Sequence, residues 1–368
     1  MKKLVSLLMA LCLLMGIATV AVAEGSEWRV AMITDYGDIT DQSFNQTTYE
    51  AAKAFCDANG VDFTYYKPVG DSTAERVAMV DKAVGDGYNV IVMPGYAFGE
   101  TIAETQDMYP NVKFIALDVS EGDLGGATLA PNTFSAVYKE ELAGYMAGYA
   151  AVKLGYTHLG YLGGMAVPAV VRYGYGFVQG ADAAAVEDGA DVTLEFVYGN
   201  QFYGDADITA YMDNWYQTLG VELVFACGGG IYTSVAEAAA KVEGAKLIGV
   251  DVDQSGLIDA TYKEGITVTS AMKGLAATVD TLLTATIIDG TFDELYGGQL
   301  ATLGLVSADD PSANYVQLPE TTQWADGFTQ DDYNALVAAM FDGTVTVSDD
   351  ITAMPETTIA INDLGNVK

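Results

Sequence analysis

Histidine and cysteine are scarce in this sequence of 368 residues, which contains one histidine and three cysteines. A catalytic triad of the serine-protease type uses a histidine as its base, and structural zinc sites need clusters of cysteine and histidine. His158 is the only histidine, and no Cys/His spacing typical of a metal site is present. We therefore expect no histidine-based triad and no such metal centre.

The chain begins with a segment that has the pattern of a secretory signal peptide. Lys2 and Lys3 precede an apolar run from Leu4 to Ala23, which ends in small residues before Glu24. An uncleaved membrane anchor is the alternative, because the run is nearly long enough to span a bilayer. The basic start and the polar sequel favour cleavage of residues 1–23. We expect an exported protein, in the periplasm or on the outer face of the cell envelope, with no integral membrane segment after cleavage.

Basic residues are few. The sequence has 16 Lys+Arg against 50 Asp+Glu, a formal net charge of −34. Removing Lys2 and Lys3 with the signal peptide leaves 14 − 50 = −36. Such a surface repels nucleic acid and anionic headgroups and disfavours polyanionic ligands such as nucleotides. We expect no nucleic-acid partner.

Two cysteines, Cys56 and Cys227, remain after the signal peptide. The first falls in an expected helix and the second at the end of an expected strand in the other lobe. We predict that both are buried free thiols and not a disulfide.

Strand and helix patterns alternate along the first part of the chain. Expected strands cover residues 28–34, 62–67, 90–94 and 112–117, and expected helices cover 46–59, 72–86 and 98–108. This alternation is typical of a parallel sheet with helices on both faces. The sequence therefore predicts an α/β fold.

The pattern then starts again. A helix is expected from Ser135, followed by strands at 157–162, 193–197, 223–226, 246–250 and 266–270, with helices around Phe177, from Asp205, from Ile231 and over 274–289. The last residues give a helix pattern only at 331–341. We expect lobe 1 at 24–131 with a returning segment near 271–300, lobe 2 at 132–270, and a C-terminal segment, 301–368, of unclear placement.

An internal repeat supports two similar lobes. A shift of 133 positions lays Val90–Gly95 over Leu223–Gly228 and Phe114–Asp118 over Leu247–Asp251. Each lobe thus ends one expected strand with an aspartate, Asp118 in the first lobe and Asp251 in the second. Matching acidic groups at two sheet edges suggest a cleft between the lobes that closes on a ligand. Similar echoes also arise from βα periodicity alone, which is the alternative.

The stretch from Asp35 to Asn45 connects the first strand to the first helix. Ser43 and Gln46 fit a capping box, which would begin the helix near Ser43 and put Phe44 and Asn45 in its first turn. Such turns line the ligand crevice of open α/β sheets. Phe44 offers a stacking face beside hydrogen-bonding groups, or alternatively it is an ordinary core residue.

Two further motifs do not complete a cofactor or metal pattern. Gly228–Gly230 opens a helix but lacks a third glycine at Thr233 and the Lys-Ser/Thr of a Walker loop. We interpret it as a tight turn that approaches a neutral ligand. Asp251–Gly256 begins like a calcium loop, but its twelfth position is Tyr262 and not glutamate. We expect neither a metal nor a cofactor.

Several motifs together resemble one family. These motifs are Ser43-Phe-Asn-Gln46, Gly95-Tyr-Ala-Phe98, Phe114-Ile-Ala-Leu-Asp118, Glu141-Leu-Ala-Gly144, Gly176-Phe177, Ile248-Gly-Val-Asp-Val-Asp-Gln254 and Thr269-Ser-Ala-Met-Lys273. With them, the sequence resembles the basic membrane protein (Bmp) family of ABC transporter substrate-binding proteins, which includes purine nucleoside receptors, from about Val30 to Val279. The resemblance implies a type I periplasmic-binding-protein fold, two similar lobes each with a mostly parallel sheet, no catalysis, and an ABC permease as partner.

The resemblance also implies a ligand site. It assigns ligand contacts to Asp41, Phe44, Asn45, Asp118, Phe202, Asp251 and Lys273. Phe44 and Phe202 would sandwich the base, although Phe202 is alternatively a loop aromatic that packs on its own lobe. Polar contacts to the base fall to Asp118 and to the turn from Asp41 to Asn45. Asp251 and Lys273 would hold ribose hydroxyls and pair with each other.

The expected function is therefore capture of a nucleoside, with a purine nucleoside favoured, for delivery to a membrane permease. A sugar or another small ligand is the nearer alternative. A calcium-dependent nucleoside hydrolase is the more distant one, because Thr34–Asp41 faintly resembles its aspartate cluster but has Ile33 where that cluster begins with aspartate. The sequence also lacks the lipobox cysteine that is usual in the family, since Cys12 follows a large Leu11.

Overall fold

The computed structural model describes residues 28–367, so the predicted signal peptide lies outside the described residues. The chain forms two compact units. Unit 1 contains the described residues up to Thr40, Phe44–Tyr138 and Gly274–Leu303; unit 2 contains Asp41–Ser43, Lys139–Lys273 and the described residues from Gly304 onward. The first long passage between units follows Tyr138, and the boundary predicted from the sequence was after Pro131.

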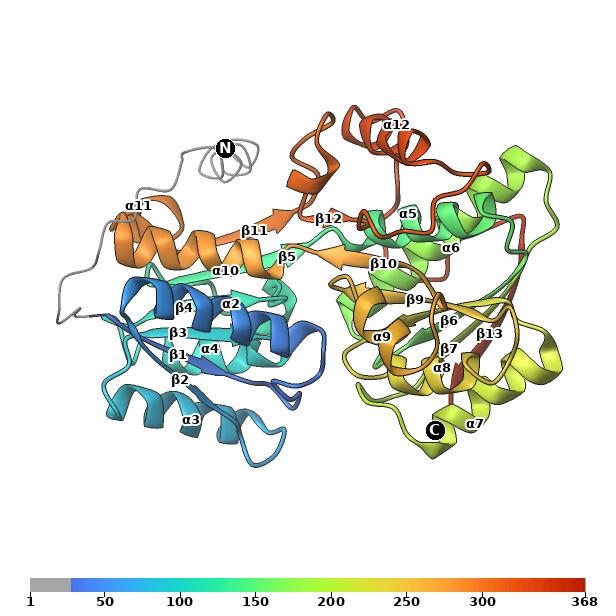
Figure 1. Ribbon diagram of the computed structural model, residues 1–368. Coiled ribbons are helices and arrows are strands. Elements are labelled where there is room, and N and C mark those ends of the chain that lie inside the picture. Colours follow the sequence, from blue (N-terminus) through green and yellow to red (C-terminus); the bar gives the residue numbers. More distant parts are fainter. Residues whose placement is uncertain (1–27, 368) are drawn as a thin grey trace. The chain divides into compact units, whose positions relative to one another are not determined.

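Unit 1 is built on a six-stranded parallel sheet in the order β11-β5-β4-β3-β1-β2. Its strands are β1 (Arg29–Ile33), β2 (Asp62–Tyr66), β3 (Val90–Pro94), β4 (Lys113–Leu117), β5 (Thr133–Tyr138) and β11 (Gln299–Leu303). All side chains of β3 are buried, which requires cover on both faces. That cover comes from α2 (Phe44–Asn59) and α10 (Leu275–Leu283) on one face and α3 (Thr73–Gly85) and α4 (Gly99–Thr105) on the other (Figure 1).

Unit 2 has a seven-stranded sheet in the order β12-β10-β9-β8-β6-β7-β13, in which only β12 runs antiparallel. The central strands are β6 (His158–Gly163), β7 (Thr193–Tyr198), β8 (Leu223–Cys227), β9 (Lys246–Asp251) and β10 (Thr267–Lys273). Within this unit, α5 (Glu140–Lys153) and α6 (Pro168–Asp188) lie on one face of the sheet, and α7 (Ala206–Asn214), α8 (Tyr232–Ala239) and α9 (Ser255–Thr261) on the other (Figure 1).

Glycines let α5 and α6 pack backbone against backbone. A Cβ added at Gly144 would lie 2.2 Å from the carbonyl oxygen of Tyr173, and one at Gly176 would lie 2.1 Å from that of Glu141. Any larger residue at these positions would separate the helices. The glycines of two of the motifs quoted above therefore have a packing role.

The helix expected from Ser135 is wrong. Residues Thr133–Tyr138 form β5, and the helix begins only at Glu140. All six side chains of β5 are buried, and the strand pairs with β4 on one side and β11 on the other. This segment is a strand because it pairs with strands on both sides, and the local sequence pattern does not show that pairing.

The repeat predicted from the sequence is visible in the two units. Strands β3, β4 and β5 are neighbours in unit 1 as β8, β9 and β10 are in unit 2. Gly95 and Gly228, 133 positions apart, have φ angles of 126° and 139°, and Asp118 and Asp251 have φ angles of 62° and 66°. Left-handed backbone is uncommon for residues other than glycine, so its recurrence at both aspartates reflects a shared strand-end geometry.

The C-terminal segment from Gly304 belongs to unit 2. It contributes β12 (Val316–Gln317), α12 (Gln330–Phe341) and β13 (Ala360–Asn366). β13 pairs in parallel with β7 and so adds an outer strand to the sheet. Most side chains of β13 are exposed, which explains why no apolar pattern predicted it.

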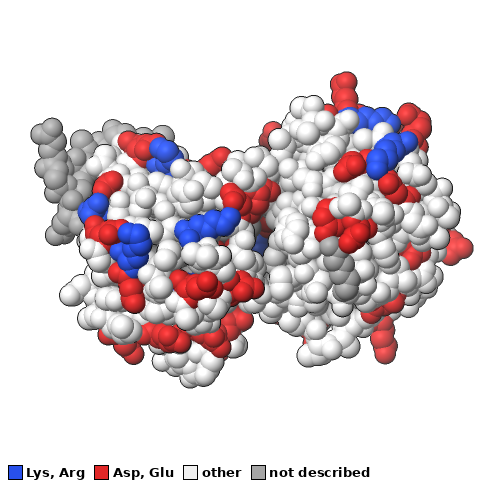
Figure 2. Space-filling view, turned by 90° about the horizontal axis from the view of Figure 1, so that it is seen from below, with Lys and Arg blue, Asp and Glu red and all other residues white. Residues whose placement is uncertain are grey.

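Cys56 and Cys227 are buried free thiols, as predicted. Within residues 28–367, the helices are all too short or too polar to cross a membrane. Figure 2 shows acidic side chains spread over the visible face of each unit, with fewer lysines and arginines among them.

Candidate functional site

In unit 1, the buried Asp35 holds the turn after β1 together by hydrogen bonds. Asp35 Oδ1 accepts hydrogen bonds from the Gly37 backbone N (2.6 Å) and from Asn45 Nδ2 (3.2 Å). Asn45 is buried and Phe44, which begins α2, is half-buried. A Cβ at Gly95 would lie 2.7 Å from Asp35 Oδ2, so the neighbouring strand end needs glycine there. The predicted first-turn placement of Phe44 and Asn45 is confirmed.

Asp118 lies at the same edge of the unit 1 sheet. It follows β4 directly, and its backbone N donates to the Ala136 carbonyl of β5 (2.7 Å). Parallel strands bring their carboxyl ends to one edge. Phe44, Asn45 and Asp118 therefore all follow strands at one edge of unit 1.

Asp251 and Lys273 end adjacent strands of unit 2. They terminate β9 and β10, and Lys273 Nζ lies 3.9 Å from Asp251 Oδ1. Ser43, which also belongs to unit 2, donates its hydroxyl to Asp251 Oδ2 (2.5 Å). Burial raises the pKa of Asp251, and the charge of Lys273 and the Ser43 hydroxyl partly offset this rise.

Lys273 is also paired with a second buried carboxylate. Its Nζ lies 3.3 Å from Glu140 Oε1, and Arg172 Nε donates to Glu140 Oε2 (2.7 Å). Burial by itself raises the pKa of Glu140, but the positive charges of Lys273 and Arg172 outweigh it and hold the pKa below its ordinary value. The sequence analysis did not identify Glu140 or Arg172 as part of a site.

The segment Asp41–Ser43 is fastened to the unit 2 edge by a buried glutamine. Gln254 Nε2 donates to the Gln42 carbonyl (3.0 Å), and Gln254 Oε1 accepts from the Val250 backbone N (2.9 Å). The half-buried Asp41 accepts a hydrogen bond from the Ser43 backbone N (2.9 Å), and its charge contributes to the raised pKa of Asp251. Gln254 is thus a third residue, after Glu140 and Arg172, that sequence reasoning missed.

Phe202 packs on the strand ends of its own unit. A Cβ added at Gly164 would lie 2.5 Å from the Phe202 ring, and one at Gly228 would lie 2.9 Å from it. The Gly230 backbone N donates to the Phe202 carbonyl (2.8 Å). The ring remains half-buried. The glycine turn at 228–230, interpreted from the sequence as an approach to a ligand, is therefore where Phe202 approaches the backbone.

The seven predicted site residues fall into two groups. Phe44, Asn45 and Asp118 lie at the carboxyl edge of the unit 1 sheet, and Asp41, Phe202, Asp251 and Lys273 belong to the corresponding edge of unit 2. Their roles in ligand binding stay predictions.

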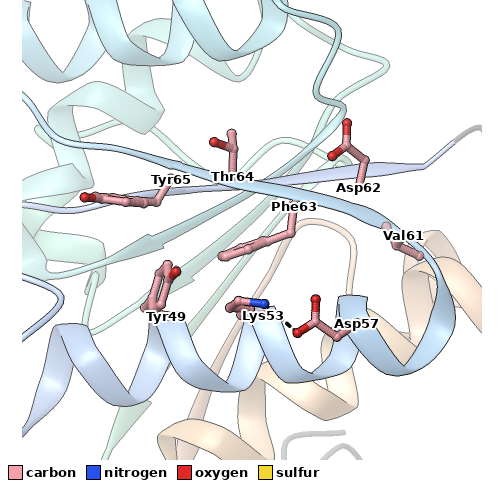
Figure 3. Close-up of a pocket in the computed structure, with 8 residues that line it drawn as sticks. All are labelled: Tyr49, Lys53, Asp57, Val61, Asp62, Phe63, Thr64 and Tyr65. Carbon is pink, nitrogen blue, oxygen red and sulfur yellow. Dashed lines mark hydrogen bonds and ion pairs between the residues drawn. The ribbon is translucent and has the colours of Figure 1, made fainter.

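Two surface pockets lie elsewhere. One, of about 350 Å³, is in unit 1 between α2 and β2. Tyr49 and the Lys53–Asp57 ion pair line it from α2, and Phe63 and Tyr65 line it from β2 (Figure 3). The other, of about 400 Å³, lies in unit 2 beside α7 and α8. Neither is lined by any of the predicted ligand contacts.

Solved structures identify the fold. The fold matches an ABC transporter solute-binding protein from Aeropyrum pernix K1 with a TM-score of 0.65 and 21% identity, covering 87% of each chain. It matches one from Conexibacter woesei DSM 14684 with a TM-score of 0.66 and 22% identity, covering 88% of this chain and 99% of that one. The chain has the periplasmic-binding-protein fold of ABC transporter solute-binding proteins.

The family model described as "ABC transporter substrate-binding protein PnrA-like" matches residues 28–310, and the chain belongs to this Bmp family. It is 26% identical over 296 residues to the "ABC transporter nucleoside-binding protein BmpA" of Lactococcus lactis subsp. cremoris, which covers 76% of this chain and 80% of the relative. It is 27% identical over 279 residues to a "CD4+ T-cell-stimulating antigen" of Listeria innocua, which covers 72% and 74%. Members of the family are extracytoplasmic substrate-binding proteins and not enzymes.

Glu141, next to Glu140, gives a testable pH dependence. It is 3% exposed, its Oε2 has no hydrogen-bond partner among the described residues, and burial raises its pKa to about 7. A raised folded-state pKa means that stability is lost as the pH rises from the unfolded value near 4.5 through 7. Glu141→Gln cannot ionise. The free energy of unfolding of Glu141→Gln minus that of wild type should therefore be about 1–3 kcal/mol larger at pH 8 than at pH 5.

Denaturant titrations at the two pH values measure this change. The matched control is Glu264→Gln, which alters an exposed glutamate of unit 2 and should show no such trend. A difference between Glu141→Gln and wild type that is the same at both pH values would contradict the prediction.

Proposed function

We propose that this chain captures a nucleoside, with a purine nucleoside as the favoured ligand, and delivers it to an ABC transporter permease from the periplasm or the outer face of the cell envelope. Membership of the Bmp family supports the transporter role, and the name of the Lactococcus relative supports the ligand class. The observation that carries the proposal is the edge of the unit 2 sheet, which combines a phenyl ring, a buried carboxylate and a buried ammonium.

Each of these groups suits one part of a nucleoside. A carboxylate accepts hydrogen bonds from the vicinal hydroxyls of ribose, and an ammonium donates to their oxygens. Asp251 and Lys273 are 5% exposed each, so an analogue without hydroxyls would leave both poorly satisfied. We assign ribose recognition to this pair.

The base is assigned to aromatic and polar groups. Phe202 and Phe44 are half-buried rings, and an aromatic ring binds the π-face of a purine by stacking. Asp118, Asn45 and Asp41 supply carboxylate and amide groups that recognise the edge of a base. A sugar shares only the hydroxyl contacts, so its binding would not depend on either ring.

Calorimetric titration with adenosine, guanosine, inosine, ribose and amino acids tests the proposal directly. We expect saturable binding of at least one nucleoside, and of a purine nucleoside more tightly than ribose. Binding of ribose alone would favour the sugar alternative. A protein that is folded by circular dichroism but binds none of the nucleosides would refute the proposal.

Phe44→Ala tests stacking. It should weaken nucleoside binding by about 1–3 kcal/mol, the range measured for stacks of a base on an aromatic side chain. Calorimetry with the nucleoside that binds wild type measures the loss. Phe341→Ala, which removes a phenylalanine of α12 that is 47% exposed, is the control and should leave affinity unchanged. An equal affinity for Phe44→Ala and wild type would remove Phe44 from the site.

Asp251→Asn tests recognition of the hydroxyls. The carboxamide offers a weaker acceptor and loses the attraction to Lys273, so nucleoside affinity should fall about tenfold to a hundredfold. The matched control is Asp253→Asn, an exposed aspartate two positions further along. If the two variants bind the nucleoside equally well, Asp251 does not contact the ligand.

A further inference from the structure

Four charged side chains form a row in unit 2, in which Glu140, Lys273 and Asp251 are buried and Arg172 is half-buried. Arg172 Nε lies 2.7 Å from Glu140 Oε2, Lys273 Nζ lies 3.3 Å from Glu140 Oε1, and Lys273 Nζ lies 3.9 Å from Asp251 Oδ1. The signs alternate along the row. When all four groups are ionised, their formal charges sum to zero.

The row neutralises Lys273 before any ligand arrives. The side chain of Lys273 is 3% exposed and that of Glu140 is 0% exposed, so water screens neither charge. Buried charges persist only when they are paired. Asp251 is the second carboxylate beside the ammonium, and Asp41 is near enough to act on Asp251 electrostatically. An anionic group brought to Lys273 would therefore meet negative charge that already compensates the lysine.

We propose that Glu140 is a specificity-determining residue that makes the site select neutral nucleosides and reject their phosphorylated forms. This inference rests on the proposed function. Without Glu140, Lys273 would be an under-compensated ammonium, which is a common phosphate-binding group in proteins. With Glu140 in place, a phosphate loses its hydration on binding, and the already compensated Lys273 attracts it too weakly to offset that cost.

Arg172 is the positioning residue for Glu140. Its guanidinium engages one carboxylate oxygen, and this leaves the other oxygen directed at Lys273. Glu140 begins α5, and Arg172 lies in the first turns of α6, which packs against α5 through the glycine contacts described above. The two helices thus hold the carboxylate in place independently of a ligand.

Glu140→Gln tests the inference because it keeps the size of the side chain and makes the row one unit more positive. Adenosine, guanosine and inosine, each with its 3′- and 5′-monophosphate, are titrated into wild type and variant by calorimetry. For a nucleoside that wild type binds, the ratio of Kd for a monophosphate to Kd for the nucleoside should fall at least about tenfold. An unchanged ratio for both monophosphates would overturn the inference. Failure of wild type to bind any nucleoside would instead overturn the proposed function.

Two controls separate charge from structural damage. Glu140→Gln combined with Arg172→Gln returns the sum of charges to zero but leaves Lys273 without its nearest carboxylate, so its ratio should lie between those of Glu140→Gln and wild type. Glu195→Gln removes another buried carboxylate of unit 2, which contacts His158 and Asn362, and should leave the ratio unchanged. A low ratio in Glu195→Gln would show that the effect is not specific to Glu140, and a ratio in the double variant below that of Glu140→Gln would show that added positive charge is not its cause.

A further variant covers the case in which Glu140→Gln does not fold, as judged by circular dichroism. Combining Glu140→Gln with Arg172→Lys keeps the same charge sum, and the flexible lysine can turn to solvent because the Arg172 side chain is already 17% exposed. In this variant too, the ratio of the monophosphate Kd to the nucleoside Kd should fall about tenfold, because the row again gains one positive charge. A wild-type ratio in this folded variant would overturn the inference.

Discussion

The buried ammonium of Lys273 is the constraint on which the unit 2 edge depends. A lysine that is almost fully removed from water must be compensated, and Glu140 and Asp251 do this from α5 and β9. Glu140 in turn ties in Arg172 from α6, and Asp251 ties in Ser43. The ammonium of Lys273 thus connects residues that are up to 230 positions apart in the sequence, from Ser43 to Lys273. The same pairing makes the edge polar without leaving it strongly charged.

Close backbone approach at glycines is the second organising feature. In unit 1, Gly95 makes room for Asp35, and in unit 2 Gly164 and Gly228 make room for the Phe202 ring. Gly144 and Gly176 bring α5 against α6, which carry Glu140 and Arg172. These glycines therefore set the positions of the charged and aromatic groups by allowing close packing.

The two sheet edges resemble each other in backbone geometry, while their chemistry differs. The glycine and aspartate backbone angles recur at an offset of 133, so each unit presents a left-handed aspartate after its strand. Only the aspartate of unit 2 is almost fully buried and faces a lysine at the end of the next strand. The offset of 133 also pairs Phe44 with Phe177 in the sequence. The structure separates the two, because Phe44 begins α2 whereas Phe177 lies in the middle of α6, fully buried against Tyr161 and Phe225. The two edges thus share a backbone frame and carry different side chains.

The α/β class, the repeat, the start of α2 and the free thiols could be predicted from the sequence, because they follow from local periodicity, turn chemistry and composition. That Thr133–Tyr138 is a central strand and that the C-terminal residues extend the unit 2 sheet depends on contacts between distant segments, which no local pattern shows. The pairing of Lys273 with Asp251 was predicted from the family resemblance. Its pairing with Glu140 was not, since nothing near Glu140 or Arg172 in the sequence indicates that these residues meet. Pairing of charges over long separations depends on where the helices pack, and that packing is a property of the folded chain.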